Sequence, residues 1–412
     1  MSTSPDDSGQ WHKTEFAVIV AVFLYFGGTS FVIPFLPLYV MELDDLDVPT
    51  AALWSGAILG IAPLVSGVVA PFWGRLSDRF GHKVLLQRSL LGFTICLGLM
   101  GIARSPLDLL IIRGLMGLVG GFSVATQALI SVSAPRSQVM SAIGRTNAAR
   151  VLGMAIGPIP GGVLADAVGV RGACLASVAG GVVALIVVTV LAKAPRIVRM
   201  VGSRPTRRER TRPLLSGGFP GLLLSVTATR LVEKSYDPVL PLLIASLYGN
   251  PFGTGTTTAL VSSAGLLATA IGAGAAGRLG GRSSPARGLR LRALLLAASL
   301  LTAATFFASF WGLLLALRAA VGFAVGLAGS LAIAQAALAT PLSRRGAAMG
   351  VIGSGTAFGA AAGSAGAGLL APLALPAVFI LDAVLLGGAS LILWLRRESL
   401  QRDDDQVLDA SS

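Results

Sequence analysis

Long apolar stretches alternate with short polar connections along most of the chain. A helix needs roughly 20 apolar residues to cross the hydrocarbon core of a bilayer. The stretches that meet this length are 16–40, 51–73, 84–103, 107–131, 141–164, 171–192, 214–247, 256–277, 291–310, 312–339, 346–371 and 375–395. The first of them has no small-residue cleavage site, so we expect it to be retained as a membrane helix rather than removed as a signal peptide.

The composition supports a protein that folds in lipid. Of 412 residues, 54% are hydrophobic and 12% are charged, whereas a soluble domain carries about 25% charged residues. The two histidines and two cysteines show no spacing typical of a metal site or a disulfide framework. We therefore expect neither a metal nor another cofactor, and two buried, inert thiols.

Basic residues are distributed unevenly between the two sides of the predicted bundle. Lysine and arginine concentrate in the even-numbered connections, at Arg75–Lys83, 193–212 and 278–292 above all, whereas the first connection is acidic. The positive-inside rule then places both termini in the cytoplasm of a plasma (inner) membrane protein. The net charge of +13 follows from this topology, so no nucleic-acid partner is expected.

The chain also matches itself when shifted by a little over 200 residues. The paired strings keep their order, and each contains proline, glycine or arginine at the same spacing. They are Pro34-x-x-Pro37 with Pro238-x-x-Pro241, Arg113-x-x-x-Gly117 with Arg318-x-x-x-Gly322, and Gly153-x-x-x-Gly157 with Gly359-x-x-x-Gly363. A duplicated six-helix unit predicts an N-terminal bundle at 1–192, a basic linker at 193–213, a C-terminal bundle at 214–395 and a tail at 396–412. The solute site is expected between the bundles.

The clearest motif reads GRLSDRFGHK between the second and third spans. Its glycines permit a tight turn, and its acid can latch one conformation by pairing with a helix end or an arginine. A solvated loop that only sets orientation is the alternative. The candidate gating residues are Gly74, Asp78, Arg79, Gly81 and Lys83. This string resembles the signature loop of the major facilitator superfamily.

Two further strings carry the same resemblance. Residues 109–117 are similar to the intramembrane-arginine motif of that family, and residues 153–162 to the motif of its antiporter branch. The residues of the second string are Gly153, Gly157, Pro158, Gly161 and Gly162. Small residues allow close helix packing and prolines allow bending, so a packing seam with no role in coupling is the alternative.

The resemblance covers nearly the whole chain. It implies an all-α membrane protein with the major facilitator fold, in which twelve transmembrane helices form two pseudo-symmetric six-helix bundles. The N-terminal half is most similar to the twelve-helix drug:proton antiporters, and among them to the MdtG-type exporters, at strings 34–40, 54–56, 71–74 and 118–121. In the second half the loop string 277–282 has no acid, so a latch there cannot work in the same way.

Four charged residues interrupt the seventh span, namely Arg230, Glu233, Lys234 and Asp237. Their spacing places them on one helical face. Each charge at the bilayer centre costs roughly 2.5–3.5 kcal/mol, so we expect them to face the bundle interior or a wet cavity and to pair partly with one another. Glu233 and Asp237 are the proton-coupling candidates, because a partly buried carboxylate binds protons more readily and the first span, 16–40, holds no acid. An ion-pair ladder that only fixes packing is the alternative.

Other polar and aromatic residues at membrane depth are candidates to line a substrate cavity. With two basic residues of the seventh span, they are Arg230, Lys234, Tyr236, Arg113, Arg150, Gln127, Asn147, Tyr25, Phe26 and Phe31. Arg150 is expected to point inward, as a cavity cation or as a partner for Asp237 or Glu233. The long seventh span is expected to be tilted, or to be kinked or broken at Pro238. Asp382 is expected to be solvated near the outer surface, and Asp108 to cap the fourth helix.

The sequence favours a secondary transporter that works as a monomer, with membrane lipids, protons and a small-molecule substrate as its partners. The first hypothesis is a proton-coupled antiporter that exports amphipathic drugs by alternating access. The second is a specific transporter of a charged or zwitterionic solute, such as a metallophore, an amino-acid derivative or a lipid. No constellation of catalytic side chains occurs at membrane depth, so an enzyme is not predicted.

Overall fold

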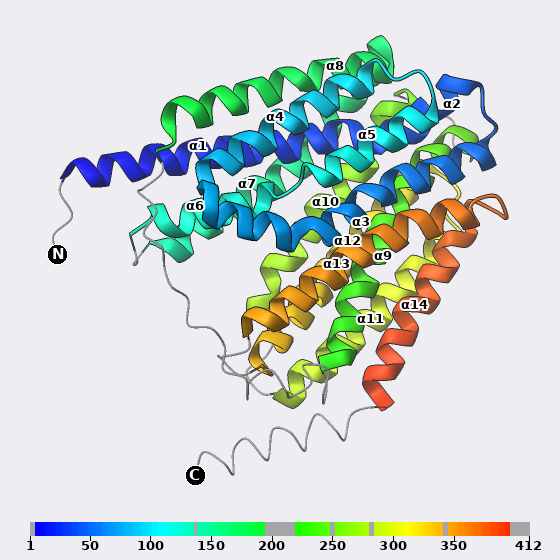
Figure 1. Ribbon diagram of the computed structural model, residues 1–412. Coiled ribbons are helices and arrows are strands. Elements are labelled where there is room, and N and C mark those ends of the chain that lie inside the picture. The colour runs from blue at the N-terminus through cyan, green and yellow to red at the C-terminus, as the bar shows by residue number, and fades with distance from the viewer. Residues whose placement is uncertain are drawn as a thin grey trace. The chain divides into compact units, whose positions relative to one another are not determined.

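The computed structural model describes residues 5–135, 138–193, 219–247, 252–279, 284–340 and 345–395. Within these ranges the chain folds into helices and contains no strand (Figure 1). The predicted linker beyond Lys193 and the predicted tail at 396–412 lie outside the described residues.

The helices follow the predicted spans, and several spans are divided. In the first half they are α1 (Pro5–Val32), the 3-10 helix η1 (Ile33–Phe35), α2 (Leu36–Asp44), α3 (Val48–Phe80), α4 (His82–Gly101), α5 (Pro106–Leu118), α6 (Phe122–Ser133), α7 (Val139–Ile156) and α8 (Pro158–Leu191). In the second half they are α9 (Phe219–Leu247), α10 (Thr254–Leu279), α11 (Ser284–Thr305), α12 (Trp311–Leu338), α13 (Arg345–Leu370) and α14 (Ala377–Leu395). Two glycines with positive φ interrupt the regular helical backbone. Gly121 (φ 97°) separates α5 from α6, and Gly169 (φ 76°) lies inside α8 between the fifth and sixth spans.

Most of the described chain is helix that is long and apolar enough to cross a membrane, in places as two or three consecutive helices. In the described part of the chain, nine helical stretches are long and apolar enough to do so, and one of them, Ser141–Leu191, contains two predicted spans. α9 and α13 are long helices outside this set. α9 carries the four charged residues, and α13 is rich in weakly hydrophobic glycine and alanine.

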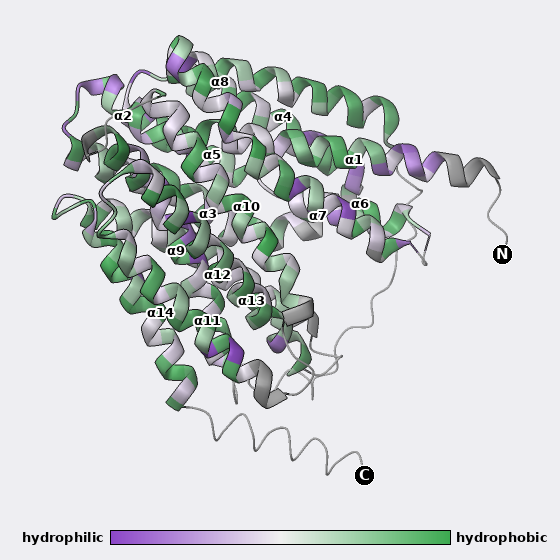
Figure 2. Cartoon of the chain, turned by 180° about the vertical axis from the view of Figure 1, so that it is seen from behind, coloured by the Kyte–Doolittle hydropathy of each residue, from purple (hydrophilic) through white to green (hydrophobic). Residues whose placement is uncertain are grey.

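The surface agrees with a lipid environment. Large apolar side chains such as Val68, Leu300, Phe358 and Trp394 are exposed, and Figure 2 shows mostly hydrophobic residues along the lengths of the helices. A soluble protein rarely exposes so much contiguous apolar surface. The chain is therefore built as a multi-pass membrane protein.

The helices form two compact units. Unit 1 comprises Met1–Met200 and Asp237–Ser263, and unit 2 comprises Val201–Tyr236 and Ala264–Ser412. The division therefore passes through α9 between Tyr236 and Asp237. It also passes through α10, between Ser263 and Ala264.

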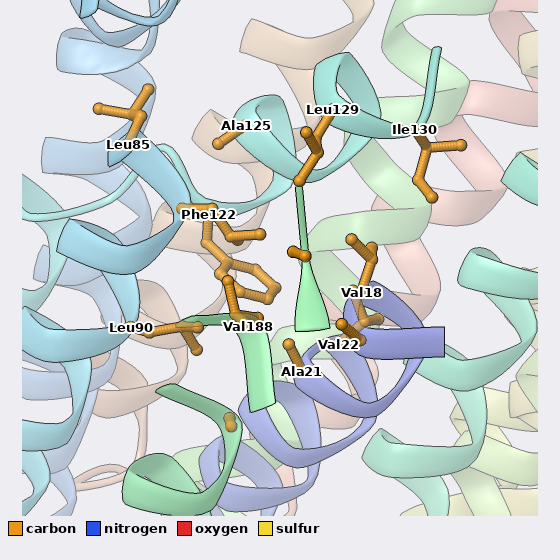
Figure 3. Packing of buried hydrophobic residues seen from close by; sticks show 14 of the residues in the cluster. Val18, Ala21, Val22, Leu85, Leu90, Phe122, Ala125, Leu129, Ile130 and Val188 are labelled. Atoms are coloured by element: carbon orange, nitrogen blue, oxygen red, sulfur yellow. The ribbon is translucent and has the colours of Figure 1, made fainter. Parts of the chain in front are cut away.

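In unit 1, α1 packs against α7 and α8, α4 packs against α8, and α3 packs against α5. One apolar cluster joins α1, α4, α6 and α8 through side chains that include Val18, Leu90, Phe122 and Val188 (Figure 3). A second cluster contains both cysteines, Cys96 and Cys174, as buried side chains. The two thiols are thus part of the apolar interior.

The break between α5 and α6 leaves carbonyl groups that need donors. Arg88 of α4 donates from Nη2 to the carbonyl oxygens of Val119 and Gly120, at 2.7 Å each. Trp73 donates from its indole nitrogen to the carbonyl of Leu118 at 2.9 Å, and the Arg88 guanidinium stacks on the Trp73 ring 3.4 Å from its centroid. Neighbouring helices therefore satisfy the interrupted backbone, as a membrane protein requires.

In unit 2, α11 packs against α12 and α14. Glycines bring two other helix pairs into backbone contact. A Cβ at Gly359 of α13 would lie 2.5 Å from the Thr227 carbonyl oxygen of α9, and a Cβ at Gly326 of α12 would collide with the Thr269 carbonyl of α10. In unit 1, Gly117 of α5 approaches the Ala62 carbonyl of α3 in the corresponding way. The same helix pairs thus pack closely in both units, in agreement with the internal repeat.

Candidate functional site

The charged stripe of α9 contains a direct ion pair. Arg230 Nη1 donates to Glu233 Oε2 at 2.7 Å, one helical turn apart. The Glu233 side chain is only 5% exposed, whereas that of Arg230 is 38% exposed. The acid is therefore inside unit 2, and its cation reaches the unit's surface.

Arg318 of α12 is a second cation near this pair. Its side chain is 3% exposed, and its charge acts on Glu233 together with those of Arg230 and Lys234. The guanidinium lies over the ring of Tyr236, with its central carbon 4.2 Å from the ring centroid. The predicted cavity residue Tyr236 is thus buried against a cation.

Pro238 does not break α9, which runs without interruption from Phe219 to Leu247. A proline has no N–H and leaves the carbonyl four residues earlier without its helical donor. That carbonyl belongs to Lys234, and it accepts a hydrogen bond from Ser364 Oγ of α13 at 3.2 Å. A neighbouring helix supplies the missing donor, and the expectation of a break was wrong for this reason.

Asp237, the second proton-coupling candidate, belongs to unit 1. It interacts electrostatically with Arg113 of α5, a buried arginine whose Nε donates to the carbonyl of Ile58 at 3.3 Å. Arg150 was predicted to be a cavity cation or a partner of one of the α9 acids, and this stays a prediction. In the structure the Arg150 guanidinium lies 5.9 Å from the ring centroid of Phe26.

Tyr25 lies at the centre of an aromatic group next to Arg113. Its ring stacks on Phe122 with centroids 3.9 Å apart and planes 5° from parallel, and it also contacts Phe93 at 4.1 Å and Phe26 at 5.2 Å. Arg113 interacts electrostatically with Tyr25 as well. The predicted cavity residues Tyr25, Phe26 and Arg113 are therefore close together.

The other predicted lining residues are not part of this group. Gln127 and Asn147 have exposed side chains, and their predicted place in a cavity stays a prediction. Phe31 is partly buried, and its carbonyl faces Gly161. Within the described residues, no group of three or more His, Cys, Asp or Glu side chains could hold a metal ion.

The motif between the second and third spans is mostly helical. α3 extends through it to Phe80, and Gly81, with φ 95°, makes the tight turn that the glycines were expected to permit. Lys83 donates from Nζ to the carbonyl of Thr189, near the end of α8, at 3.0 Å, where a cation is favourable. The side chains of Gly74, Asp78 and Arg79 lie outside the described parts, so the predicted latch stays a prediction.

The glycines of the antiporter-type string lie against the backbone of α1. A Cβ at Gly153 would be 2.5 Å from the Phe23 carbonyl oxygen, and a Cβ at Gly157 would be 2.5 Å from that of Gly27. Pro158 begins α8, and Gly161 continues the contact with α1. Gly162 faces a different helix, since its Cβ would lie 2.5 Å from the Gly255 carbonyl oxygen of α10.

Three acids take part in contacts that sequence reasoning did not foresee. Asp382 was expected to be solvated but is 2% exposed. Glu15, just before the first apolar span, is buried and ion-paired with Arg145. Asp166 of α8 binds the start of α10. By contrast, the prediction for Asp108 is confirmed, because it forms a capping box with Ser105 at the start of α5.

Asp166 acts as an N-cap supplied by another helix. Its carboxylate accepts hydrogen bonds from the backbone N–H of Gly255 at 2.9 Å, the N–H of Thr256 at 2.8 Å and the Thr256 hydroxyl at 2.6 Å. Gly253, with φ 88°, leaves room for it, because a Cβ there would lie 2.5 Å from a carboxylate oxygen. An acid at a helix N-terminus is also favoured by the helix dipole.

Replacing Asp166 with alanine is expected to destabilise the protein by about 1 kcal/mol, the usual effect of losing a helix cap. Asp166→Asn, which keeps one acceptor oxygen, should lose less. The measurement is the thermal unfolding midpoint of detergent-purified protein, with Ser354→Ala, a substitution at an exposed serine of α13, as the control. An Asp166→Ala protein that melts at the wild-type temperature would contradict this role for the cap.

The fold and the site together define a class of protein. Long apolar helices with lipid-compatible surfaces enclose a small number of buried charged groups, and such groups in membrane proteins mark pathways for ions and solutes. This is the construction of a multi-pass membrane transporter. The chain belongs to the major facilitator superfamily, because the model of that family, described as Major Facilitator Superfamily, matches residues 18–229 and 222–406.

Relatives and solved structures agree with this assignment. The chain is 33% identical over 312 residues to a protein of Escherichia fergusonii named multidrug resistance protein MdtG, covering 75% of this chain and 76% of the relative. It is 33% identical over 314 residues to the protein of the same name from Enterobacter lignolyticus, covering 75% and 74%. A bacterial homolog of the human lysosomal transporter Spinster, in an inward-facing and unoccupied conformation, has the same fold with a TM-score of 0.76, 14% identity and coverage of 98% and 99%.

Proposed function

We propose that the protein exports amphipathic small molecules in exchange for protons, by alternating access of two six-helix bundles. Relatives that share a third of their residues with it over most of its length carry the name multidrug resistance protein. The observation that carries the proposal is the Glu233–Arg230 pair, an acid buried within a membrane helix beside a cation that reaches the surface of its unit.

The pair can couple a proton to a conformational change by simple electrostatics. Protonation of Glu233 removes the negative charge that holds the Arg230 guanidinium at 2.7 Å, so the ion pair is lost and Arg230 is released. Deprotonation restores it. Asp237 and Arg113 form a second pairing of an acid and a cation, in unit 1.

The membrane setting is part of the same proposal. The basic excess in the connections predicted to be cytoplasmic supports a plasma (inner) membrane protein with both termini in the cytoplasm. Close packing of glycines within each unit, as at Gly157 and Gly359, supports rigid bundles that move as bodies. We propose that the protein acts as a monomer surrounded by lipid.

A second candidate is a transporter of one charged or zwitterionic solute. It is favoured by the partial exposure of the Arg230 side chain, 38%, beside a second cation, Lys234. A solute with a carboxylate or phosphate could compete with Glu233 for these groups. A cavity that binds hydrophobic cations would not need the positive charges of Arg230 and Lys234.

The test is transport by purified protein in proteoliposomes with an acidic interior. We expect uptake of a fluorescent amphipathic cation such as ethidium against its gradient, and its loss when a protonophore collapses the pH gradient. Glu233→Gln and Asp237→Asn should each lower this uptake by about tenfold or more, equivalent to about 1.4 kcal/mol of coupling. If both variants transport at the wild-type rate, the assignment of these acids is wrong. If only an anionic or zwitterionic solute is transported, the second candidate is correct.

A further inference from the structure

Asp382 is an acid in the interior of unit 2. It lies on α14, is 2% exposed, and its Oδ2 is hydrogen-bonded to the hydroxyl of Ser235 on α9. The sequence placed it near a helix end and predicted that water would surround it. Packing of α14 on α11 and the short side chains of α9 instead enclose it.

The number of hydrogens available at the Ser235 hydroxyl bears on whether Asp382 is protonated or ionised. Ser235 Oγ lies 2.9 Å from the Val232 carbonyl oxygen and also contacts Asp382 Oδ2. A serine hydroxyl has one hydrogen, and an ionised carboxylate has none. With an ionised Asp382, the Val232 carbonyl and the carboxylate must share this one hydrogen. A protonated Asp382 can instead donate to Ser235 Oγ and leave the hydroxyl hydrogen entirely to Val232, so the protonated form fits both contacts better.

A cation is available to balance Asp382 when its proton leaves. The charge of Arg318 acts on both Asp382 and Glu233. Within the described residues, Arg318 Nε is buried and has no hydrogen-bond partner. Arg318 stacks on Tyr236, whose ring contacts Phe379 of α14 at 4.9 Å. One cation thus lies within electrostatic reach of two acids on different helices.

Among the described residues, the other groups near Asp382 are a phenol and several hydroxyls. Tyr236 of α9 is a titratable neighbour, and its hydroxyl lies 3.4 Å from Thr305 Oγ1 of α11. α11 otherwise presents the hydroxyls of Thr302 to Tyr236 and of Ser299 to the carbonyl of Ala383. Among the described residues, Arg318 is therefore the charge that an ionised Asp382 would meet.

We propose that Asp382 is a proton-exchanging group of the transport cycle, protonated in this conformation and held by Arg318 after its proton passes to water. On release of the proton to water, the Ser235 hydroxyl turns from the Val232 carbonyl to the carboxylate, and the charge of Arg318 balances that of the carboxylate. While its positive charge balances the negative charge of Asp382, Arg318 stabilises ionised Glu233 less. The protonation of one acid therefore affects the protonation of the other. This inference rests on the proposed proton coupling.

The first test is infrared spectroscopy of the purified full-length protein near neutral pH. The wild-type spectrum should contain a protonated carboxylic C=O band that is lost in Asp382→Asn. Ser235→Ala keeps the acid but removes its partner, so it should shift the band. If Asp382→Asn does not fold, the Ser235→Ala shift alone decides. A spectrum unchanged in every folded variant would overturn the proposal.

The second test is transport in the proteoliposome assay, read as the ratio of uphill uptake to downhill drug exchange. Asp382→Asn should lower this ratio by about tenfold or more, a coupling loss of about 1.4 kcal/mol, and Asp382→Glu should restore part of it. Ser390→Ala on the same helix, whose hydroxyl contacts the Arg292 carbonyl, is the control that keeps the ratio. An unchanged ratio in Asp382→Asn defeats the inference alone, whereas wild-type protein without any uphill uptake defeats the proposed function.

Discussion

Substituting Arg230 with methionine should destabilise the protein strongly, because it leaves Glu233 buried without its 2.7 Å partner. Breaking a buried ion pair by removing one member costs about 3–5 kcal/mol. We expect a value at or below the lower end of this range, because the Arg230 side chain is 38% exposed and Arg318 also acts on Glu233. The measurement is the unfolding transition of detergent-purified protein.

The double variant Arg230→Met with Glu233→Gln is the matched control. Removing both charges leaves no unpaired ion, so most of the lost stability should return. Transport by this variant separates the two interpretations of the α9 stripe. A stable double variant with wild-type proton-driven uptake would show a packing ladder only, and a stable but inactive one would support a role of Glu233 in coupling. Wild-type stability of the single variant would contradict the ion-pair argument itself.

Gly157→Leu is expected to prevent normal folding. Even a single carbon added at this position would lie 2.5 Å from the Gly27 carbonyl oxygen of α1. Overpacking a core costs about 1–3 kcal/mol when side chains can move aside. Here the obstacle is backbone, so α1 and the α7–α8 junction must separate along their contact. We expect little monodisperse protein in size-exclusion chromatography.

Gly144 provides a control for this substitution within the same string of helices. It lies in α7, and nothing is within 4 Å of a Cβ placed there. Gly144→Ala should therefore fold with a normal yield, and the better helix propensity of alanine adds up to about 1 kcal/mol. If Gly157→Leu and Gly144→Ala give the same yield, the close approach of α1 is not important for folding.

The fold class could be predicted from the sequence because lipid imposes simple rules. Span length, basic connections and the repeated strings are local properties, and family membership confirmed the fold class they implied. The charged stripe could also be predicted, because four charged residues in one apolar stretch must face the bundle interior or a water-filled cavity. The partners of these four charged residues were harder to predict from the sequence. The Arg230–Glu233 pair follows from helical spacing, whereas the link from Asp237 to Arg113 joins distant segments.

Residues whose roles depend on tertiary packing escaped prediction. Asp382 is near a helix end in sequence, and only the packing of α14 buries it. Asp166 caps a helix that begins nearly 90 residues later. Pro238 has the sequence signature of a helix break, but Ser364 supplies a donor to the carbonyl it frees. In each case a partner on another helix determines the outcome, and a single chain read in order does not show which helices meet.

The burial of both native thiols has a practical consequence for experiments that follow conformational change. Cys96 and Cys174 are 4% and 0% exposed, so maleimide and spin-label reagents should leave the unmodified protein nearly unlabelled. Reporter cysteines can therefore be introduced one or two at a time without first deleting the natural ones. Distance measurements between such probes, in micelles or nanodiscs, then need no cysteine-free background.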